Sequence, residues 1–552
     1  MSIATALLRQ AQAQPDAIAL HWPQVRRGWR GRSVHWRAIS YAGLQQRSLA
    51  VAAGLQSLGI GPGVRVVVMV RPGCEFFVVM YALFLLGAVP VLIDPGLDRR
   101  ALKQCLAEAQ PSAFIGVGLA QLARVVLGWA RRSVRHVVTV GRRWFPGGWT
   151  LAQVERHGAK QQPHARLPTV ADSALAAVLF TSGSTGVPKG VAYTHAMFAA
   201  QVELLRTAFA ITPGGINLPT FPPFALFDPA LGLTSVIPEM DPRHPARADP
   251  ARLAATIERF GCTLMFGSPA LIGVLGDWGQ RHETRLSTLR TVISAGAPVA
   301  PEKVARMLAM LPTGARLWTP YGATEALPVA VAEGAELLGE VRGRTAAGGG
   351  ICVGRPLAAN TVRIIAIDDA ALRTWAEVEE LPTGAIGEIT VRGPSVTHAY
   401  DARPAATALA KIRDRDAAIV HRMGDLGYFD HQGRLWFAGR KSERVQTAVR
   451  LYFTECVEQV CNEDPAVLRS ALVGIGQRPH QRPVLCIERR RGVDLPWQRL
   501  CERLLERLAA EGATQGIDTF LQYPGVFPVD IRHNAKIGRA RLAEWATRRL
   551  QK

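Results

Sequence analysis

A stretch rich in glycine and hydroxyl side chains, with one lysine, is the part of the sequence best suited to hold a phosphate chain. It lies between Leu179 and Gly190, at the end of the apolar run Ala174–Phe180. Glycines let backbone N–H groups turn toward an anion, hydroxyls add donors, and a lysine adds a mobile charge. A Walker A loop is excluded because Pro188 precedes the lysine and Gly190 follows it. We expect a polyphosphate-binding loop of another pattern, formed by Thr181, Ser182, Gly183, Ser184, Thr185, Gly186 and Lys189.

Four further polar stretches follow the loop in a fixed order. They are Ser-Ala-Gly-Ala-Pro at 294–298, Tyr-Gly-Ala-Thr-Glu at 321–325, Gly-Asp-Leu-Gly-Tyr at 424–428 with Gly439-Arg440 after it, and Asn-Ala-Lys-Ile at 534–537. A single Ser/Gly/Thr cluster is typical of a linker or a turn. The ordered set is far more specific than any one member, so we interpret the stretches together.

The loop lies among segments that alternate between strand and helix. Apolar runs bounded by turn residues predict strands at 64–70, 88–92, 113–117, 134–140 and 174–180, with helices at 74–86, 99–109 and 119–130. This alternation favours a mostly parallel sheet covered by helices. The loop follows the last of these strands, at the carboxyl end where open α/β sheets bind ligands.

The rest of the chain predicts a second α/β unit and then a change of character. An opening helix, a strand near 18–21 and a helix at 41–58 begin the chain; a helix at 195–209 and strands at 264–266, 291–293 and 316–318 follow the loop. Between 340 and 440, short strands at 361–367, 387–392 and 435–437 suggest an antiparallel, barrel-like subdomain.

The last part of the chain predicts a smaller α+β unit. Its candidate strands lie at 470–473 and 484–487, and its candidate helices at 452–462 and 497–510. We therefore expect an α/β protein with a large N-terminal domain, residues 1–440, and a small C-terminal domain, residues 441–552.

An aromatic, proline-rich segment, Phe221–Pro229, has two interpretations. It is apolar and rich in turn residues, so it could line a pocket, and Phe224 and Phe227 would then be lining residues. A plain core loop is an equally good interpretation of the segment taken alone.

Composition limits the classes of partner. The net charge is +21 over 552 residues, which invites a nucleic-acid or anionic-membrane hypothesis. The arginines are spread along the chain, and no helix-turn-helix, zinc-finger or RNA-binding signature accompanies them. A solvated basic surface is therefore favoured over a nucleic-acid partner.

Cysteine usage and hydropathy favour a cytoplasmic protein without a membrane span. The eight cysteines form no CxxC pair, which indicates reduced thiols rather than a disulfide framework or a zinc site. The start of the chain lacks the features of a signal peptide. Phe76–Ile93 carries no charge, but Gly87 and Pro90 interrupt it, so strand, buried helix and strand are favoured over a transmembrane helix.

The five motifs together resemble the ANL superfamily of adenylate-forming enzymes, which includes acyl-CoA synthetases, peptide-synthetase adenylation domains and luciferases. The resemblance covers nearly the whole chain. It implies a large N-terminal domain of two α/β sheets and a barrel subdomain, a small mobile C-terminal domain, and an active site in the cleft between them. ATP and Mg²⁺ would be the cofactors.

The resemblance also implies roles for the residues of the nucleotide site. The segment 181–189, including Thr185 and Lys189, would hold the β- and γ-phosphates of ATP. The adenine would lie between the Tyr321 ring and a backbone stretch formed by Ala295, Gly296, Ala297 and Pro298. Gly322 and Thr324 belong to the same site, and Thr324 would approach a phosphate.

Four ionisable residues complete the implied site. Glu325 would bind Mg²⁺, because a hard cation prefers carboxylate oxygen. Asp425 would accept hydrogen bonds from the ribose, and Arg440 would reach ribose or phosphate. Lys536 would neutralise charge as the acyl carboxylate attacks the α-phosphorus. The alternatives are a turn cap for Asp425, a surface lysine for Lys536 and a structural ion pair for Glu325.

Departures from the acyl-CoA synthetase pattern put CoA transfer in doubt. The hinge position holds Ser442, and a β-branched residue, Val449, stands near the place where thioester-forming relatives have a glycine. The segments 221–229, 320–330 and 532–537 resemble instead the β-lactone synthetases of bacterial long-chain olefin biosynthesis. Ala323, within the second segment, is then a pocket residue beside the two phenylalanines named above.

That branch implies a substrate with its own nucleophile. A long-chain 2-alkyl-3-hydroxyalkanoic acid would be adenylated, and its β-hydroxyl would then close a lactone and expel AMP. His195 is a candidate base by position, although a structural histidine is the favoured interpretation. The branch also implies an assembly with other olefin-pathway enzymes. Two alternatives stay open: a long-chain acyl-CoA or acyl-AMP ligase, and a basic nucleic-acid- or membrane-binding protein with a decayed site.

Overall fold

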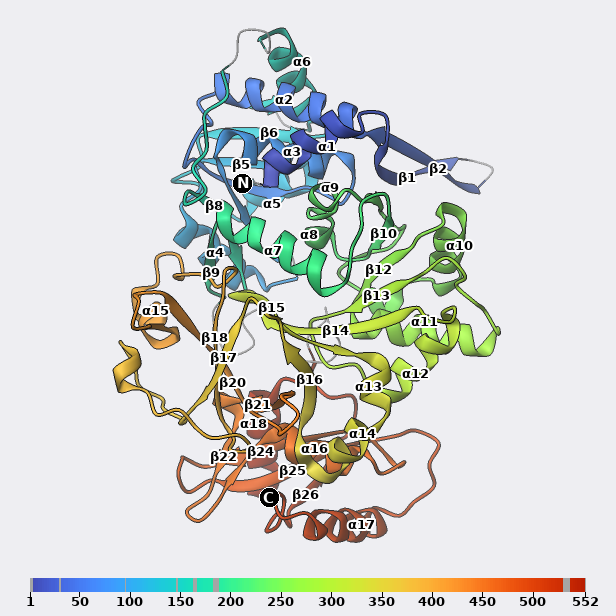
Figure 1. The fold of residues 1–552 in the computed structure, drawn as a ribbon, viewed down its shortest axis with the longest axis vertical. Helices are drawn as coiled ribbons and strands as arrows, with labels where there is room; N and C mark the ends of the chain where they lie inside the picture. The colour runs from blue at the N-terminus through green and yellow to red at the C-terminus, as the bar shows by residue number, and fades with distance from the viewer. Residues whose placement is uncertain are drawn as a thin grey trace.

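The computed structural model describes residues 3–28, 31–94, 96–144, 147–161, 166–181, 188–529 and 537–551. The molecule is elongated, with the N-terminal α/β part at one end and the C-terminal part at the other (Figure 1). Helix α1 (Ile3–Ala13) and the strand pair β1 (Ile18–Gly28) and β2 (Gly31–Ser40) open the chain. The long second strand of this pair was not predicted from the sequence.

The first sheet has seven strands in the order β7-β6-β5-β3-β4-β8-β9. Its strands are β3 (Arg65–Met69), β4 (Val89–Leu92), β5 (Ala113–Val117), β6 (His136–Val140), β7 (Trp149–Thr150), β8 (Leu175–Phe180) and β9 (Gly190–Thr194). All neighbours pair in parallel except β8 and β9. Its helices are α2 (Tyr41–Ser57), α3 (Cys74–Leu86), α4 (Arg99–Ala109), α5 (Gly118–Val126) and α6 (Leu151–Gln161). The predicted alternation is confirmed.

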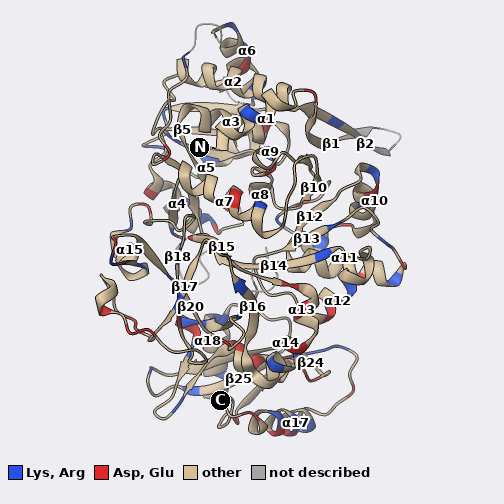
Figure 2. Cartoon of the chain, in the orientation of Figure 1, with Lys and Arg blue, Asp and Glu red and all other residues tan. Residues whose placement is uncertain are grey.

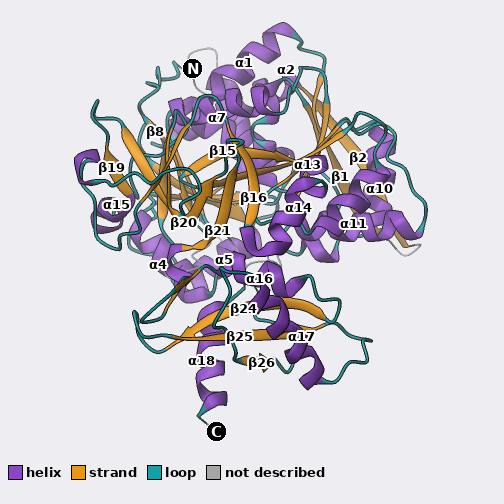
Figure 3. Ribbon diagram, turned by 60° about the horizontal axis from the view of Figure 1, so that its bottom comes forward, coloured by secondary structure: helices purple, strands orange, loops and turns teal. Residues whose placement is uncertain are grey.

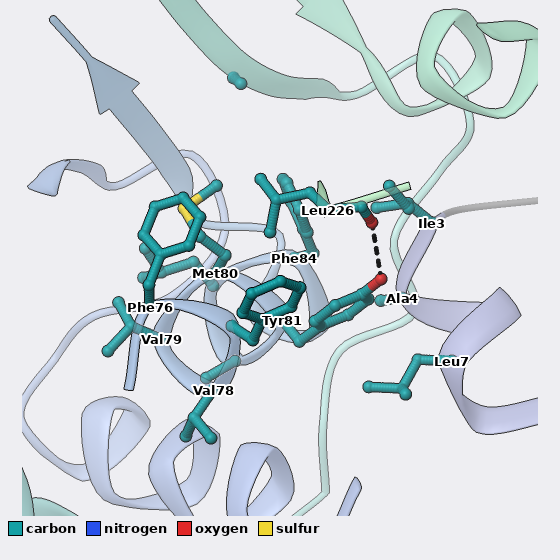
Figure 4. Close-up of a cluster of buried hydrophobic side chains, with 14 of the residues drawn as sticks. Ile3, Ala4, Leu7, Phe76, Val78, Val79, Met80, Tyr81, Phe84 and Leu226 are labelled. Carbon is teal, nitrogen blue, oxygen red and sulfur yellow. Dashed lines mark hydrogen bonds between the residues drawn. The ribbon is translucent and has the colours of Figure 1, made fainter. Parts of the chain in front are cut away.

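Helix α3 is the centre of the largest hydrophobic core. Its residues are apolar on every side and nearly all are buried, as expected for a helix covered all round. Gly87 ends the helix in the left-handed conformation, φ 63°. The Tyr81 hydroxyl donates to the Leu226 carbonyl at 2.9 Å, which ties α3 to the predicted pocket segment (Figure 4). In the described part of the chain, no helix is both long and apolar enough to cross a membrane.

The second sheet begins as a parallel sheet around which the predicted second α/β unit is built. Its parallel strands are β11 (Thr234–Val236), β10 (Ile216–Pro219), β12 (Leu264–Gly267), β13 (Thr291–Ser294) and β14 (Arg316–Ala323). The associated helices are α7 (His195–Ala208), α10 (Pro250–Phe260), α11 (Pro269–Arg281) and α12 (Pro301–Met310).

Antiparallel strands continue the second sheet beyond β14. They are β15 (Ala326–Glu333), β16 (Ile351–Pro356), β21 (Leu435–Arg440), β20 (Ile419–Phe429), β18 (Gly387–Arg392) and β17 (Thr361–Ile365), with β19 (Lys411–Arg413) paired to β20. The antiparallel strands predicted between 340 and 440 are confirmed. They share backbone hydrogen bonds with the parallel strands through β15 and β16, so nucleotide-site motifs on β14 and β20 belong to one sheet.

The C-terminal part is the predicted α+β unit. It contains β24 (Val467–Ile475), β25 (Arg482–Arg489) and β26 (Phe520–Gln522), with α16 (Thr454–Asn462), α17 (Trp497–Ala510) and α18 (Arg539–Leu550) around them (Figure 3). The small hairpin β22 (Val445–Gln446) and β23 (Leu451–Tyr452) precedes them. Two hydrophobic clusters lie within this part, so it has cores of its own.

Charge and cysteine placement agree with the sequence analysis. Lys and Arg occur in every part of the chain, with Asp and Glu between them (Figure 2). All eight cysteines are free, and all except the half-buried Cys501 are buried. Burial raises the pKa of the Cys74 thiol to about 11, which keeps it protonated near neutral pH.

Candidate active site

The base of the predicted phosphate loop is closed by reciprocal hydrogen bonds. The Thr181 N–H donates to the Lys189 carbonyl at 3.0 Å, and the Lys189 N–H donates to Thr181 Oγ1 at 3.2 Å. The antiparallel strands β8 and β9, which the predicted loop connects, pair up to Phe180 and Gly190. Ser182, Gly183, Ser184, Thr185 and Gly186 lie outside the described residues.

A tyrosine joins the loop lysine to the predicted metal ligand. Lys189 Nζ lies 4.8 Å from the centroid of the Tyr400 ring, and the Tyr400 hydroxyl donates to Glu325 Oε1 at 2.6 Å. Glu325 follows β14 and is only 9% exposed. Burial, and then the Glu325 charge, raise the pKa of Tyr400, so its hydroxyl remains a donor. The structure therefore brings Lys189 and Glu325 to the same small region.

Behind Glu325 lies a buried lysine that sequence reasoning missed. Lys411 Nζ donates to the carbonyl and, at 3.2 Å, to Oγ1 of Thr397. Burial lowers the pKa of Lys411 to about 7, against the Glu325 charge, which raises it. His421 donates from Nδ1 to the Ala410 carbonyl at 3.1 Å, and burial, followed by the Lys411 charge, lowers its pKa well below the ordinary value. His421 is thus neutral near Lys411.

Three predicted nucleotide-site residues form one network. The Tyr321 hydroxyl donates to Asp425 Oδ2 at 2.7 Å, and Arg440 Nη1 forms an ion pair with Asp425 Oδ1 at 2.8 Å. Asp425 and Arg440 are register partners on β20 and β21. Asp425 is 3% exposed. The charge of Asp425 is the main cause that raises the pKa of Arg440. The Asp425 carboxylate is therefore held at both of its oxygens.

The predicted adenine-binding segment continues from β13. Ser294 ends that strand, and Ala295, Gly296, Ala297 and Pro298 form the loop before α12. Gly296 has φ 103°, a conformation that favours glycine. Because β13 and β14 are neighbours in the sheet, this loop and Tyr321 emerge from adjacent strands.

Gly322 and Thr324 shape the turn that carries Glu325. A Cβ atom at Gly322 would lie 2.6 Å from the Ala326 carbonyl oxygen, so this position requires glycine. The Thr324 carbonyl accepts a hydrogen bond from the Tyr193 hydroxyl, and Tyr193 also accepts one from Gln201 at 3.3 Å. Ala323 packs against the core of the antiparallel strands. It is not among the described residues that line the small apolar cavity beside Phe224 and Phe227, the other two predicted pocket residues.

The aromatic segment borders that cavity, as one of its two interpretations predicts. It folds into two short helices, α8 (Pro222–Ala225) and α9 (Asp228–Leu231). Phe224 and Phe227 line a cavity of about 30 Å³, and Phe224 stacks on Phe266 with ring centroids 4.1 Å apart. Ile293 and Pro320, which lie next to the adenine segment and Tyr321, line the same cavity. The cavity thus adjoins the predicted nucleotide site.

Two polar side chains in the cavity wall were missed by sequence reasoning. Asn217 Nδ2 donates to both carboxylate oxygens of Asp228, at 2.9 and 3.0 Å, and the Ser235 hydroxyl donates to Asp228 Oδ2. All other described lining residues are apolar. Asp228 follows a phenylalanine and precedes a proline in a hydrophobic segment, so its isolated charge was the one available signal.

His195 lies away from these groups. It is fully buried at the start of α7, edge-on to Phe84 with ring centroids 6.1 Å apart. Neither ring nitrogen has a hydrogen-bond partner in the described part of the chain, and burial lowers its pKa. It is not among the described residues that line the cavity. These surroundings support the structural interpretation.

The remaining predicted residues lie in the C-terminal part. Lys536 is outside the described residues, but α18 begins at Arg539, which forms ion pairs with Glu443 at 2.8 Å and with Glu458. Ser442 is exposed in a short 3₁₀ turn after β21. Val449 is 93% exposed at the tip of the β22–β23 hairpin, where its branched side chain meets solvent.

The fold and the candidate site agree with a nucleotide-dependent enzyme, and the sequence comparison gives its family. The sequence matches the family described as AMP-binding enzyme over residues 7–401. The chain belongs to this family, and the ANL resemblance found in the sequence is confirmed.

Two relatives align with nearly the whole chain and carry a more specific name than the family. Proteins named olefin beta-lactone synthetase from Xanthomonas campestris pv. campestris and from Stenotrophomonas maltophilia are each 56% identical to this chain. The first alignment covers 99% of this chain and 97% of the relative, and the second covers 100% and 99%. The solved amide bond synthetase McbA from Marinactinospora thermotolerans, 22% identical, shares the fold with a TM-score of 0.77 over 98% of this chain and 99% of that one.

Proposed function

We propose that this chain is an ATP- and Mg²⁺-dependent β-lactone synthetase of long-chain olefin biosynthesis. It adenylates a 2-alkyl-3-hydroxyalkanoic acid with release of diphosphate, then closes the activated acid to a β-lactone with release of AMP. The observation that carries the proposal is the 56% identity, over 99% of the chain, to a protein named olefin beta-lactone synthetase.

Several of the described residues are suited to the contacts that adenylation needs. Lys189, with the loop before it, holds the β- and γ-phosphates. Asp425, fixed by the hydrogen bond from Tyr321 and the ion pair with Arg440, accepts hydrogen bonds from the ribose. The backbone at 295–298 and the Tyr321 ring contact the adenine, and Thr324 approaches a phosphate. A carboxylate held at both oxygens loses little rotamer entropy on binding, which supports this assignment.

Glu325 suits a Mg²⁺ ion bound together with ATP. Its carboxylate is a hard oxygen ligand, and the Tyr400 hydroxyl fixes one of its oxygens. The described ranges contain no group of three or more His, Cys, Asp or Glu side chains placed to hold a metal. Mg²⁺ is usually held by one or two carboxylates and by substrate phosphates, so one carboxylate can suffice. The ion would neutralise charge on the phosphates.

The C-terminal part would supply the catalytic lysine. We propose that residues 441–552 form a mobile domain and that Lys536 brings its ammonium to the acyl carboxylate and the α-phosphate. The ion pairs of Arg539 hold the start of α18, three residues beyond Lys536. Just beyond the hinge position Ser442, Arg444 pairs with Asp369 at 2.6 Å, a contact that a domain rotation would have to break.

The second step needs no CoA because nucleophile and electrophile share one molecule. Holding the β-hydroxyl near the activated carbonyl replaces a second substrate, and positioning alone supplies a large rate factor. We propose that the apolar residues around Phe224 and Phe227 contact the alkyl chains of the bound acid, for which the cavity of about 30 Å³ has to widen. The two alternatives, an acyl-CoA or acyl-AMP ligase and a binding protein with a decayed site, are less favoured by the full-length identity.

One incubation separates these functions. The full chain is mixed with ATP, Mg²⁺ and a long-chain 2-alkyl-3-hydroxy acid, without CoA, and products are followed by mass spectrometry. We expect lactone, AMP and diphosphate. Acyl-AMP without lactone would favour an acyl-AMP ligase, and thioester formed only after CoA is added would favour an acyl-CoA ligase. Salt-sensitive DNA binding without ATP turnover would favour the decayed site.

Location and assembly are finer proposals that rest on the same resemblance. We propose a cytoplasmic enzyme that assembles with the other enzymes of the olefin pathway. Buried, unpaired thiols support a reducing compartment. Co-purification of pathway enzymes with the tagged chain from its own host would support the assembly. Elution of the tagged chain in gel filtration without any of those enzymes would argue against it.

A further inference from the structure

A carboxylate and an amide face an otherwise apolar cavity beside the nucleotide site. Asp228 and Asn217 are 2% and 4% exposed, and both line the cavity that Phe224, Phe227 and Pro320 enclose. The cavity measures about 30 Å³, room for a hydroxyl group or a water molecule but not for an alkyl chain.

The pair has an unused acceptor. Asn217 Nδ2 donates to both oxygens of Asp228, but Asn217 Oδ1 is buried without a hydrogen-bond partner in the described part of the chain. Such an orphaned acceptor costs free energy unless a ligand supplies a donor. Asp228 Oδ1 accepts from Asn217 alone among the described residues, so a second lone pair is also available there. An O–H group is the donor that fits.

We propose that Asn217 and Asp228 bind the β-hydroxyl of the substrate and that Asp228 accepts the hydroxyl proton when the lactone closes. This inference rests on the proposed function, because only a hydroxy acid brings such a group into an apolar pocket. Asp228 is then a catalytic residue that contacts the reacting oxygen. Asn217 and Ser235 are positioning residues that hold its carboxylate.

The step balances without any added reagent. The hydroxyl oxygen forms a bond to the acyl carbon of the acyl-AMP, and the bond from that carbon to the phosphate oxygen breaks. The phosphate oxygen keeps the electron pair and leaves as AMP. The hydroxyl proton passes to Asp228 and returns to solvent after the products leave.

The environment of Asp228 supports this role. Burial raises the pKa of its carboxyl to about 7, while the hydrogen bonds from Ser235 and Asn217 lower it. A general base works best with a pKa near the working pH. Among the described residues, the Asp228 charge acts on the Tyr41 and Tyr81 hydroxyls, which donate to the Leu233 and Leu226 carbonyls, and burial is the main cause that raises the pKa of both. Arg206, on α7, donates to the Ala230 carbonyl on the same short helix as Asp228. Neither tyrosine takes a charge near neutral pH.

The test measures the two steps separately in the full chain. With ATP, Mg²⁺ and the hydroxy acid, diphosphate release reports adenylation, and lactone with AMP reports closure. For Asp228→Asn we expect lactone formation to fall at least about a hundredfold, with acyl-AMP accumulating, while diphosphate release in the first turnover stays within about tenfold. Asp277→Asn, which removes a surface carboxylate on α11, should change neither rate.

A second variant tests the proton transfer itself. Ser235→Ala removes a hydrogen bond that lowers the pKa of Asp228, so the pH of half-maximal closure should rise, a shift that a merely structural role would not produce. Wild-type chain that makes no lactone would overturn the proposed function. Wild-type chain that makes lactone, with Asp228→Asn closing it at an unchanged rate or with both steps slowed equally, would overturn this inference alone.

Discussion

The Tyr321 hydroxyl donates a 2.7 Å hydrogen bond to the Asp425 carboxylate, joining two motifs that lie 104 residues apart. Arg440 holds the other oxygen at 2.8 Å. The tyrosine thus has two tasks in the proposed site: its ring contacts the adenine and its hydroxyl orients the carboxylate that binds the ribose. A substitution that removes only the hydroxyl tests the second task separately from the first.

Tyr321→Phe should weaken ATP binding about tenfold while the protein stays folded. A hydrogen bond to a charged group contributes about 1.5–3 kcal/mol, and about 1.4 kcal/mol corresponds to tenfold in affinity. Calorimetry with a non-hydrolysable ATP analogue measures the change. Phe437→Leu, which alters the neighbouring ring at 6.3 Å and leaves Asp425 paired, is the control. An unchanged affinity in Tyr321→Phe would remove Asp425 from the ribose site.

Tyr400→Phe should raise the Mg²⁺ concentration needed for half-maximal adenylation. The phenylalanine keeps the ring beneath Lys189 but loses the 2.6 Å hydrogen bond that fixes Glu325 Oε1. A freer carboxylate binds the ion less well, and the expected change is about tenfold, as for other outer-shell partners. Titration of diphosphate release with Mg²⁺ at saturating ATP measures it. The same Mg²⁺ curve in wild type and variant would contradict the metal role of Glu325.

Phe227→Leu should move the chain-length preference toward bulkier acids. Phe227 lines the cavity and packs against Phe198 and Phe224, with ring centroids 6.2 Å away in each case. The smaller side chain enlarges the pocket at an expected stability cost of about 1 kcal/mol. Competition among acids of different length, read as lactone ratios, measures the shift. Phe114→Leu, in the core of the first sheet, is the control. If both variants keep the wild-type ratios, the segment is ordinary core.

Lys536→Ala should slow adenylation by orders of magnitude and leave ATP binding largely intact. The proposed role of the lysine is to neutralise charge that develops as the carboxylate attacks phosphorus, so its loss acts on the transition state. Diphosphate release and ATP affinity are measured on the same preparation. Arg541→Ala, just inside α18, removes a neighbouring charge as a control. Normal diphosphate release by Lys536→Ala would refute the role.

The strands of the first sheet could be predicted because their sequences are locally complete. Val66, Val67, Phe114 and Ile115 belong to short apolar runs that the fold buries, and turn residues bound each run. The β1–β2 hairpin escaped prediction because the apolar alternation in its second strand, at Val34, Trp36 and Ala38, is short and lies between arginines and a histidine. A short alternation among charged residues is a weak signal for a strand.

The residues of the candidate site also divide into those that the sequence predicts and those that it does not. Glu325, Asp425 and Lys189 lie in ordered motifs that a sequence reader can recognise. Tyr400, Lys411 and Asn217 carry no local signal, because their importance comes from contacts over long sequence distances, such as the 75 residues between Glu325 and Tyr400. Their roles follow only when the fold places a hydroxyl on a carboxylate or an amide in a cavity wall.

Asp228→Asn should stabilise the protein increasingly as the pH rises. Burial raises the pKa of Asp228 from 3.8 to about 7, so the folded state holds its proton more tightly than the unfolded state. The stability that this proton brings is complete below the unfolded pKa and is lost as the pH rises through the folded value. The asparagine variant stays neutral, so it loses no stability over this pH range. Its free energy of unfolding minus that of wild type should therefore increase with pH by about 4 kcal/mol above pH 7.

Thermal melts of both proteins between pH 4.5 and 8.5 measure this difference. The melting temperature of Asp228→Asn minus that of wild type should grow between about pH 4 and 7 and then level off. Asp277→Asn, whose carboxylate lies on the surface beside Arg306, should give a nearly constant difference over the same range. A flat difference for Asp228→Asn would mean that its carboxyl titrates at the ordinary pH, and Asp228 would then be a poor base for lactone closure at neutral pH.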